Sequence, residues 1–119
     1  MSPAPPSHTQ IAIIGGGPAG LMAAEVANAA GWQVDVCEAK GSVGRKFLIA
    51  GKGGLNLTHS EPRPAFDARY RERAPQIARW LDAFDGEALR AWAREFGIDT
   101  YVGSSGRVFP IDRKAAPLL

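Results

Sequence analysis

The chain has 119 residues, enough for one small domain, and its 45% hydrophobic and 22% charged residues are typical of a folded, water-soluble protein. The formal net charge is only +2, and basic and acidic residues are interspersed along the chain, so no basic stripe of the kind that binds nucleic acid stands out. The single cysteine, Cys37, excludes an internal disulfide, and no set of side chains has the spacing of metal ligands.

Residues 1–9 are rich in proline and are predicted to form a flexible lead-in. This segment has neither the basic start nor the apolar core of a signal peptide, and no apolar run reaches membrane-spanning length. We therefore expect a cytoplasmic protein without a membrane partner, and a lone cysteine fits that reducing compartment.

The next segment has the pattern of a βαβ unit in an α/β fold. Residues 11–14 form an apolar run that ends at three glycines, as in a parallel strand buried on both faces. Helix formers fill residues 21–30, with Pro18 before them and Gly31 after them, which predicts a crossover helix. Residues 33–37 alternate in polarity and predict a second strand. Together these elements predict a Rossmann-type unit.

Residues 40–58 contain many glycines and are predicted to form a functional loop, so that residues 10–60 make one FAD-binding unit. Residues 61–119 are predicted to lead toward a substrate domain that this chain lacks. They contain two amphipathic helical patterns with i, i+3, i+4, i+7 spacing, one at Ile77, Trp80, Leu81 and Phe84 and one at Leu89, Trp92, Ala93 and Phe96.

These two patterns are expected to form a helical hairpin. Asp85 has the position of an N-cap for the second helix, and Gly97 has the position of its C-terminal stop. Further along, residues 100–102 and 107–109 flank a glycine- and serine-rich turn and predict a hairpin or tight loop.

Residues 15–20 read Gly-Gly-Gly-Pro-Ala-Gly and match the GxGxxG motif of dinucleotide-binding folds. Gly15 allows the sharp turn from strand to helix, Gly17 allows the backbone to approach a pyrophosphate, and Gly20 allows close helix–strand packing. Pro18 and Ala19 complete the first helical turn, whose N–H groups and dipole favour an anion. The motif alone is also compatible with a glycine-rich turn that binds nothing.

Glu38 strengthens the functional interpretation, because it ends the second predicted strand about 20 residues after the glycines. A carboxylate there can accept hydrogen bonds from the hydroxyls of an adenosine ribose. It would repel a 2′-phosphate, which argues against NADP at this site and leaves FAD and NAD.

The basic residues that follow favour FAD. Gly44, Arg45 and Lys46 resemble Gly–Arg segments that run beside the dinucleotide in FAD proteins of the glutathione-reductase type. Arg45 could form paired hydrogen bonds with phosphate oxygens, and Lys46 could act as a point charge, with Lys40 nearby in the same loop.

The sequence of residues 44–58, GRKFLIAGKGGLNLT, resembles the signature loop of the BaiN-like bacterial NAD(P)/FAD-dependent oxidoreductases, and GRVFP at residues 106–110 is similar to a later segment of that family. The resemblance spans residues 10–119. The family loop reads more like SGGGRCN, from which this chain departs at Lys52, Gly54 and Leu55, as in a divergent subgroup. Lys46 and Asn56 carry over by position.

The resemblance implies an enzyme that uses FAD to pass a hydride between NAD(P)H and a small organic substrate. It also implies that downstream segments complete the flavin domain, so we expect this chain to be an N-terminal fragment, an incomplete domain that is inactive alone. Two alternatives stay open at this stage: an NAD-dependent dehydrogenase, and a non-catalytic or truncated dinucleotide-binding module.

No catalytic residue is assigned from the sequence. His59 could titrate near neutral pH, but a single loop histidine is more often a hydrogen-bonding residue than a proton donor. Cys37 is expected to be an inert core residue of the second strand, and Trp80 and Trp92 are expected to lie in the core. The sequence indicates neither the substrate nor an oligomeric state.

Overall fold

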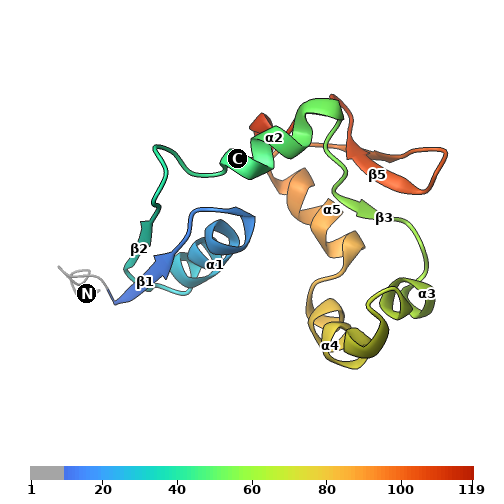
Figure 1. The fold of residues 1–119 in the computed structure, drawn as a ribbon, viewed down its shortest axis with the longest axis horizontal. Helices are drawn as coiled ribbons and strands as arrows, with labels where there is room; N and C mark the ends of the chain where they lie inside the picture. Colours follow the sequence, from blue (N-terminus) through green and yellow to red (C-terminus); the bar gives the residue numbers. More distant parts are fainter. Residues whose placement is uncertain (1–9) are drawn as a thin grey trace. The chain divides into compact units, whose positions relative to one another are not determined.

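The computed structural model describes residues 10–119, so the predicted lead-in lies outside the described residues. The chain forms two compact units, one ending at Ile49 and one spanning Ala50–Leu119 (Figure 1). The compact units divide after Ile49, ahead of the boundary expected after residue 60 for the FAD-binding unit. The physical reason is that Thr58 and His59 pair with a strand of the second unit.

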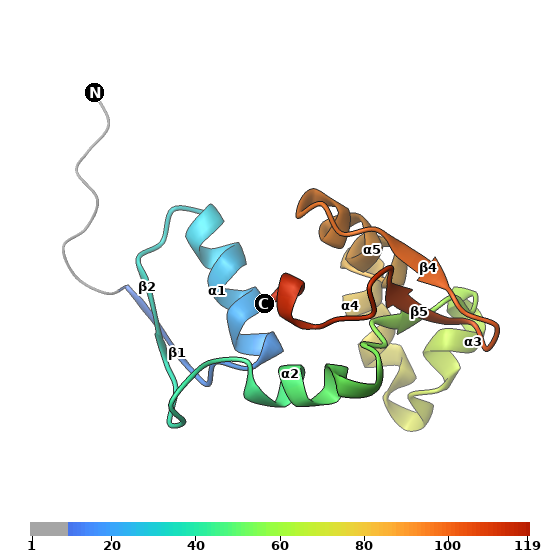
Figure 2. The ribbon, with the colours of Figure 1, turned by 90° about the horizontal axis from the view of Figure 1, so that it is seen from above.

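The first unit is a parallel βαβ unit. It comprises β1 (Ile11–Ile14), α1 (Pro18–Ala29) and β2 (Val34–Cys37), and β1 pairs with β2 along its whole length. The helix packs against both strands and lies along one side of the pair (Figure 2). The predicted α/β, Rossmann-type architecture is confirmed.

Each strand of this unit alternates between half-buried and exposed residues. Ile14 is 83% exposed, and Cys37 is exposed as well. The expectations of a strand buried on both faces and of a core cysteine are therefore wrong for this unit. Within this unit, α1 is the helix that packs against both strands.

A short helix interrupts the predicted loop of residues 40–58. It is α2 (Arg45–Ala50), and a 3₁₀ turn at Gly51–Gly53 follows it. The six residues of α2 contain no glycine or proline, so the run between Gly44 and Gly51 is free of helix breakers.

The second unit contains an antiparallel sheet in the order β3-β5-β4. These strands are β3 (Thr58–His59), β4 (Thr100–Val102) and β5 (Arg107–Pro110). The predicted hairpin is confirmed, because β4 pairs with β5 and the Gly103 N–H donates to the Arg107 carbonyl at 2.7 Å.

Three helices accompany this sheet: α3 (Arg63–Ala68), α4 (Ala74–Ala83) and α5 (Gly86–Glu95). The two amphipathic helices were predicted correctly, but their pairing as a hairpin was not. α4 packs with α3, and α5 packs with β3 and β4. No helix within residues 10–119 has both the length and the apolar character needed to cross a bilayer.

An arginine on α3 explains part of this arrangement. Arg63 forms paired hydrogen bonds with Asp67, and it also donates to the Asp82 carboxylate at 2.8 Å and to the Ala78 carbonyl at 3.1 Å. Because Ala78 and Asp82 belong to α4, one guanidinium connects the two helices.

The apolar core of the second unit is small. Leu55, Ala93, Val108 and Ala115 are its buried hydrophobic residues. Trp80 is 61% exposed, so its predicted place in the core is wrong, whereas Trp92 is half-buried with its ring edge-on to Phe96 at 5.1 Å. An amphipathic pattern identifies the apolar face of a helix but not how much of that face a neighbour covers.

Replacing Asp85 by alanine is expected to destabilise the second unit by about 1 kcal/mol. The Asp85 carboxylate caps α5 by accepting a hydrogen bond from the Ala88 N–H at 2.9 Å, as predicted. Urea unfolding would measure the loss. Asp85→Asn is the matched control, because asparagine caps equally well, and equal losses in both variants would contradict the capping role.

Candidate dinucleotide-binding site

A sharp turn at the end of β1 starts the candidate site. Gly15 has a φ of 106°, a conformation that side-chain-bearing residues rarely adopt. Its N–H donates to the Cys37 carbonyl at 2.8 Å, which extends the contact between the carboxyl ends of the two strands. The chain then turns directly into α1.

The N-terminus of α1 is open to a ligand. Gly17 is its N-cap, and among the described residues no side chain caps the helix. A Cβ at Gly17 would meet no atom within 4 Å. Pro18 follows as the first helical residue, and Ala19 is exposed beside it. The N–H groups of a first helical turn have no acceptor inside the helix, so this end suits an anionic group.

Gly20 lies where helix and strand approach most closely. A Cβ at this position would overlap the carbonyl oxygen of Gly15 and would lie 3.2 Å from the Ile13 side chain. Only a hydrogen fits between the first turn of α1 and the end of β1, so this glycine is required by packing.

The Glu38 carboxylate is tied to the glycine turn. One of its oxygens accepts a hydrogen bond from the Gly16 N–H at 2.9 Å, and the other accepts one from the Lys40 N–H at 2.8 Å. The Lys40 N–H and then the Gly16 N–H hold the pKa of Glu38 below its usual value, which favours the ionised form. A carboxylate has about four acceptor positions, so acceptor capacity remains on Glu38 beside the N–H groups of Lys40, Gly16 and Ala39.

A second hydrogen bond holds the glycine turn, this time through the carbonyl of Gly16. The Gly44 N–H donates to the Gly16 carbonyl at 2.8 Å, and Gly44 is buried with a φ of 69°. The Val43 side chain occupies the space that a Cβ on Gly16 would need. Sequence reasoning missed Gly16 and Val43. Three consecutive glycines were a signal for Gly16, but nothing in the sequence marked Val43.

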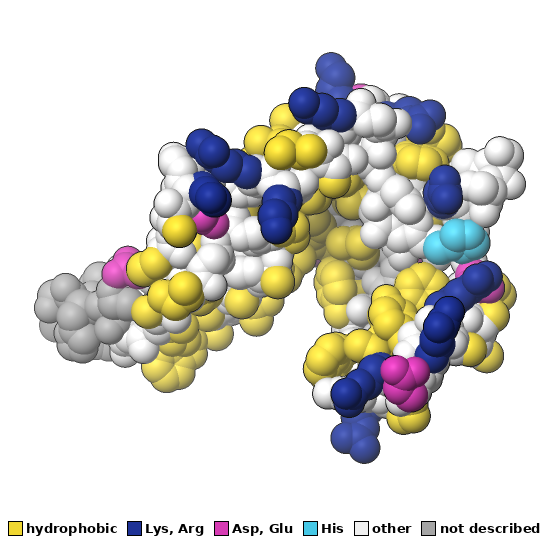
Figure 3. Space-filling model, in the orientation of Figure 1, with side chains coloured by type: hydrophobic (Ala, Val, Ile, Leu, Met, Phe, Trp, Pro, Cys, Tyr) yellow, Lys and Arg dark blue, Asp and Glu magenta, His cyan; other side chains and the backbone are white. Residues whose placement is uncertain are grey.

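Basic side chains gather over the segment that leads from β2 into α2, with an acidic side chain beside them (Figure 3). Lys40, Arg45 and Lys46 are all exposed, and Arg45 donates to the Ser42 hydroxyl at 3.2 Å. These charges belong to the same unit as Glu38, at the sequence positions that were predicted to neutralise phosphate.

The first unit therefore brings together all but one of the predicted cofactor-binding residues: Gly15, Gly17, Pro18, Ala19, Gly20, Glu38, Lys40, Gly44, Arg45 and Lys46. The exception is Asn56, which lies in the second unit. It is exposed between buried Leu55 and half-buried Leu57, whose N–H groups donate to the carbonyls of Arg113 and Val108.

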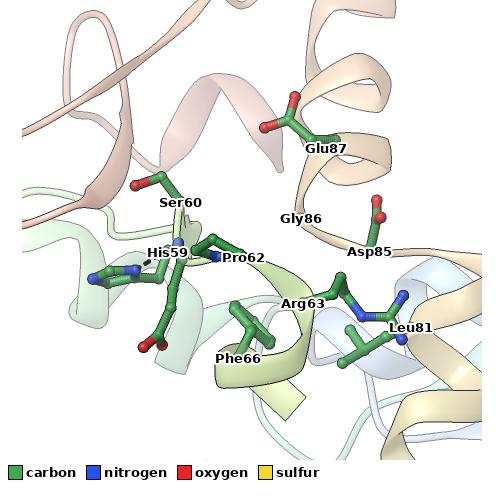
Figure 4. A pocket seen from close by; sticks show the side chains of 10 residues that line it. His59, Ser60, Pro62, Arg63, Phe66, Leu81, Asp85, Gly86 and Glu87 are labelled. Atoms are coloured by element: carbon green, nitrogen blue, oxygen red, sulfur yellow. Dashed lines mark hydrogen bonds between the residues drawn. The ribbon is translucent and has the colours of Figure 1, made fainter.

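His59 uses both ring nitrogens within the second unit. The Glu61 N–H can only donate, so Nδ1 of His59 is the acceptor at 3.0 Å, and Nε2–H then donates to the Ser105 carbonyl at 3.0 Å. The ring borders a pocket of about 180 Å³ between α3, Leu81 of α4 and the start of α5 (Figure 4). Within residues 10–119 no group of three potential metal ligands occurs.

A parallel βαβ unit, a glycine turn at a helix N-terminus and an acidic residue at the end of the second strand define a Rossmann-type nucleotide-binding unit. Residues 9–119 match the family model described as the HI0933-like protein Rossmann domain. The chain belongs to the HI0933-like family.

A curated relative supports the same assignment. The chain is 36% identical over 115 residues to the 3-dehydro-bile acid delta(4,6)-reductase of Clostridium scindens. The alignment covers 92% of this chain and 27% of the relative. Both comparisons confirm the family resemblance that the loop motifs predicted.

Proposed function

We propose that this chain is the FAD-binding portion of an oxidoreductase that passes a hydride between NAD(P)H and a small organic substrate. The observation that carries the proposal is the Glu38 carboxylate, hydrogen-bonded to the Gly16 N–H at 2.9 Å beside the open N-terminus of α1. A relative that is named a reductase supports the reaction class. The proposal takes only that class from the relative, and not its bile-acid substrate.

The residues present suit the adenosine and pyrophosphate of FAD. The proposed pyrophosphate site is the first turn of α1 with Gly17 at its entrance. A Cβ at Gly17 would meet no protein atom within 4 Å, so the space beside it is open to a phosphate. The acceptor capacity left on Glu38 suits the ribose hydroxyls. The remaining proposed contacts come from Lys40, Gly44, Arg45, Lys46 and Asn56. When bound, FAD supplies a ring system that can take up and release a hydride.

The identity of the cofactor that the protein binds distinguishes this proposal from its alternatives. The Gly44–Arg45–Lys46 segment after β2 resembles the Gly–Arg segments of FAD proteins and so favours FAD over NAD. Glu38 disfavours the 2′-phosphate of NADP. The full-length gene product should therefore purify with a flavin absorbance spectrum. Absence of flavin together with tight NADH binding would replace the proposal with an NAD-dependent dehydrogenase. Bound flavin that neither NADH nor NADPH can bleach anaerobically would indicate a non-catalytic module.

Replacing Glu38 by alanine should weaken FAD binding about tenfold to a hundredfold, because roughly 1.5–3 kcal/mol is typical of hydrogen bonds to a charged group. Fluorescence titration of the apoprotein would measure the dissociation constant. Glu38→Gln is the matched variant, because it keeps one acceptor oxygen and loses the charge. Its affinity for FAD should fall between those of the wild-type protein and Glu38→Ala.

Glu38→Ala also removes the hydrogen bonds to Gly16 and Lys40. The thermal transition of each apoprotein therefore serves as a control for the shape of the turn. Unchanged FAD affinity in both Glu38 variants would exclude the proposed ribose contact.

A further inference from the structure

The glycine-rich loop that follows α2 is attached along its length to residues 106–115 of the same unit. The Leu55 N–H donates to the Arg113 carbonyl at 2.9 Å, and the Leu57 N–H donates to the Val108 carbonyl at 2.9 Å. The loop therefore has a fixed backbone position relative to the sheet of its own unit.

The backbone of Arg113 is strained at the point of attachment. Its φ is 62°, and within residues 10–119 the only other non-glycine residue with a positive φ is Arg71, at 52°. A left-handed conformation is unfavourable for a residue with a Cβ and persists where the surrounding structure imposes it. At Arg113 this conformation accompanies two hydrogen bonds, one from its N–H to the Pro110 carbonyl at 2.9 Å and one from Leu55 to its own carbonyl.

The side chain of Arg113 also reaches the loop. Its guanidinium lies 4.5 Å from the centroid of the Phe109 ring, and that ring packs against Tyr101 at 5.7 Å. The same guanidinium borders Gly54, where a Cβ would lie 2.7 Å from Nη2. Gly54 has a φ of 113°, so its backbone conformation favours a glycine, and a Cβ there would displace the guanidinium.

Residue 54 itself carries no side chain, and the guanidinium of Arg113 lies beside its backbone. The positive charge is thus present next to the loop, although it comes from a distant part of the sequence.

We propose that Arg113 is the positioning residue of the glycine-rich loop, residues 51–57. Its carbonyl and guanidinium hold Gly54 and Leu55 against the sheet, which leaves Lys52 and Asn56 exposed on either side of them. The consequence for the cofactor rests on the proposed function, which assigns Asn56 to FAD. Arg113 acts on the cofactor through the loop.

Arg113→Ala and Arg71→Ala form a matched pair for the test. Both variants remove one exposed arginine side chain from a residue with a positive φ, but only Arg113 borders the loop. In the full-length gene product, Arg113→Ala should speed amide hydrogen exchange at Leu55 about two- to fivefold, the equivalent of one exposed cation–π contact. The dissociation constant for FAD should rise by a similar factor. Arg71→Ala should change neither quantity.

The conservative variant Arg113→Lys separates positioning from general stability. It keeps a cation near Phe109 but loses the planar group, so it should recover part of the slow exchange at Leu55 and part of the FAD affinity. Equal exchange at Leu55 in Arg113→Ala and Arg71→Ala would overturn the proposal. Faster exchange with unchanged FAD affinity would overturn its link to the cofactor. Failure of the wild-type protein to bind FAD would instead remove the proposed function, and the exchange comparison would still decide the role of Arg113.

Discussion

Replacing Gly17 by valine should reduce FAD binding by at least about a hundredfold while the first unit stays folded. Gly17 has φ −81° and ψ −176°, an extended conformation that valine adopts readily, and a Cβ there meets nothing within 4 Å. The protein itself therefore has room for the side chain. The branched carbons would instead fill the space through which a pyrophosphate approaches the first turn of α1.

Flavin content after dialysis and the thermal transition of the apoprotein together measure this effect. Gly17→Ala provides a graded comparison, because its smaller side chain should cost less affinity than valine. A folded Gly17→Val protein with normal flavin content would remove the glycine turn from the proposed site.

Replacing Gly20 by alanine should have a different kind of effect, with stability and flavin binding lost together. A Cβ at Gly20 would overlap the Gly15 carbonyl oxygen, which is backbone and cannot rotate away. The start of α1 would have to separate from the end of β1. Forcing an extra carbon into a packed contact costs about 1–3 kcal/mol.

Urea unfolding of the apoprotein would measure the destabilisation directly. Ala23→Ser is a suitable control, because Ala23 lies on the same helix and is exposed. Wild-type stability in Gly20→Ala would contradict the close helix–strand packing. The Gly17 variants therefore test the space that the ligand needs, whereas the Gly20 variant tests the packing that the fold needs.

The sequence by itself determined the βαβ unit. Helix formers lie between Pro18 and Gly31, an apolar run precedes them and a segment of alternating polarity follows them. Each element is specified by neighbours a few residues away, so its bounds follow from local preferences. The helical crossover makes β1 and β2 parallel, so their carboxyl ends lie at the same edge of the pair. Glu38 at the end of β2 therefore lies next to the glycine turn at the end of β1. That part of the candidate site was predictable because motif spacing encodes it.

Burial and helix partners were not predictable in the same way. The spacing of Trp80 predicted a place in the core, yet the side chain is 61% exposed. The predicted hairpin failed because an amphipathic face does not specify what covers it. The partner of α4 is decided instead by contacts such as the hydrogen bonds from Arg63 on α3 to Ala78 and Asp82.

Only the tertiary structure decided how the two glycine-rich segments are held. Val43 folds over Gly16, and Arg113 borders Gly54 from nearly the other end of the second unit. Neither residue belongs to a motif. Val43 fills space beside Gly16, and Arg113 accepts a hydrogen bond from Leu55, a residue remote from it in the sequence. Contacts of that kind depend on how the whole chain packs, and local sequence preferences extend over only a few residues.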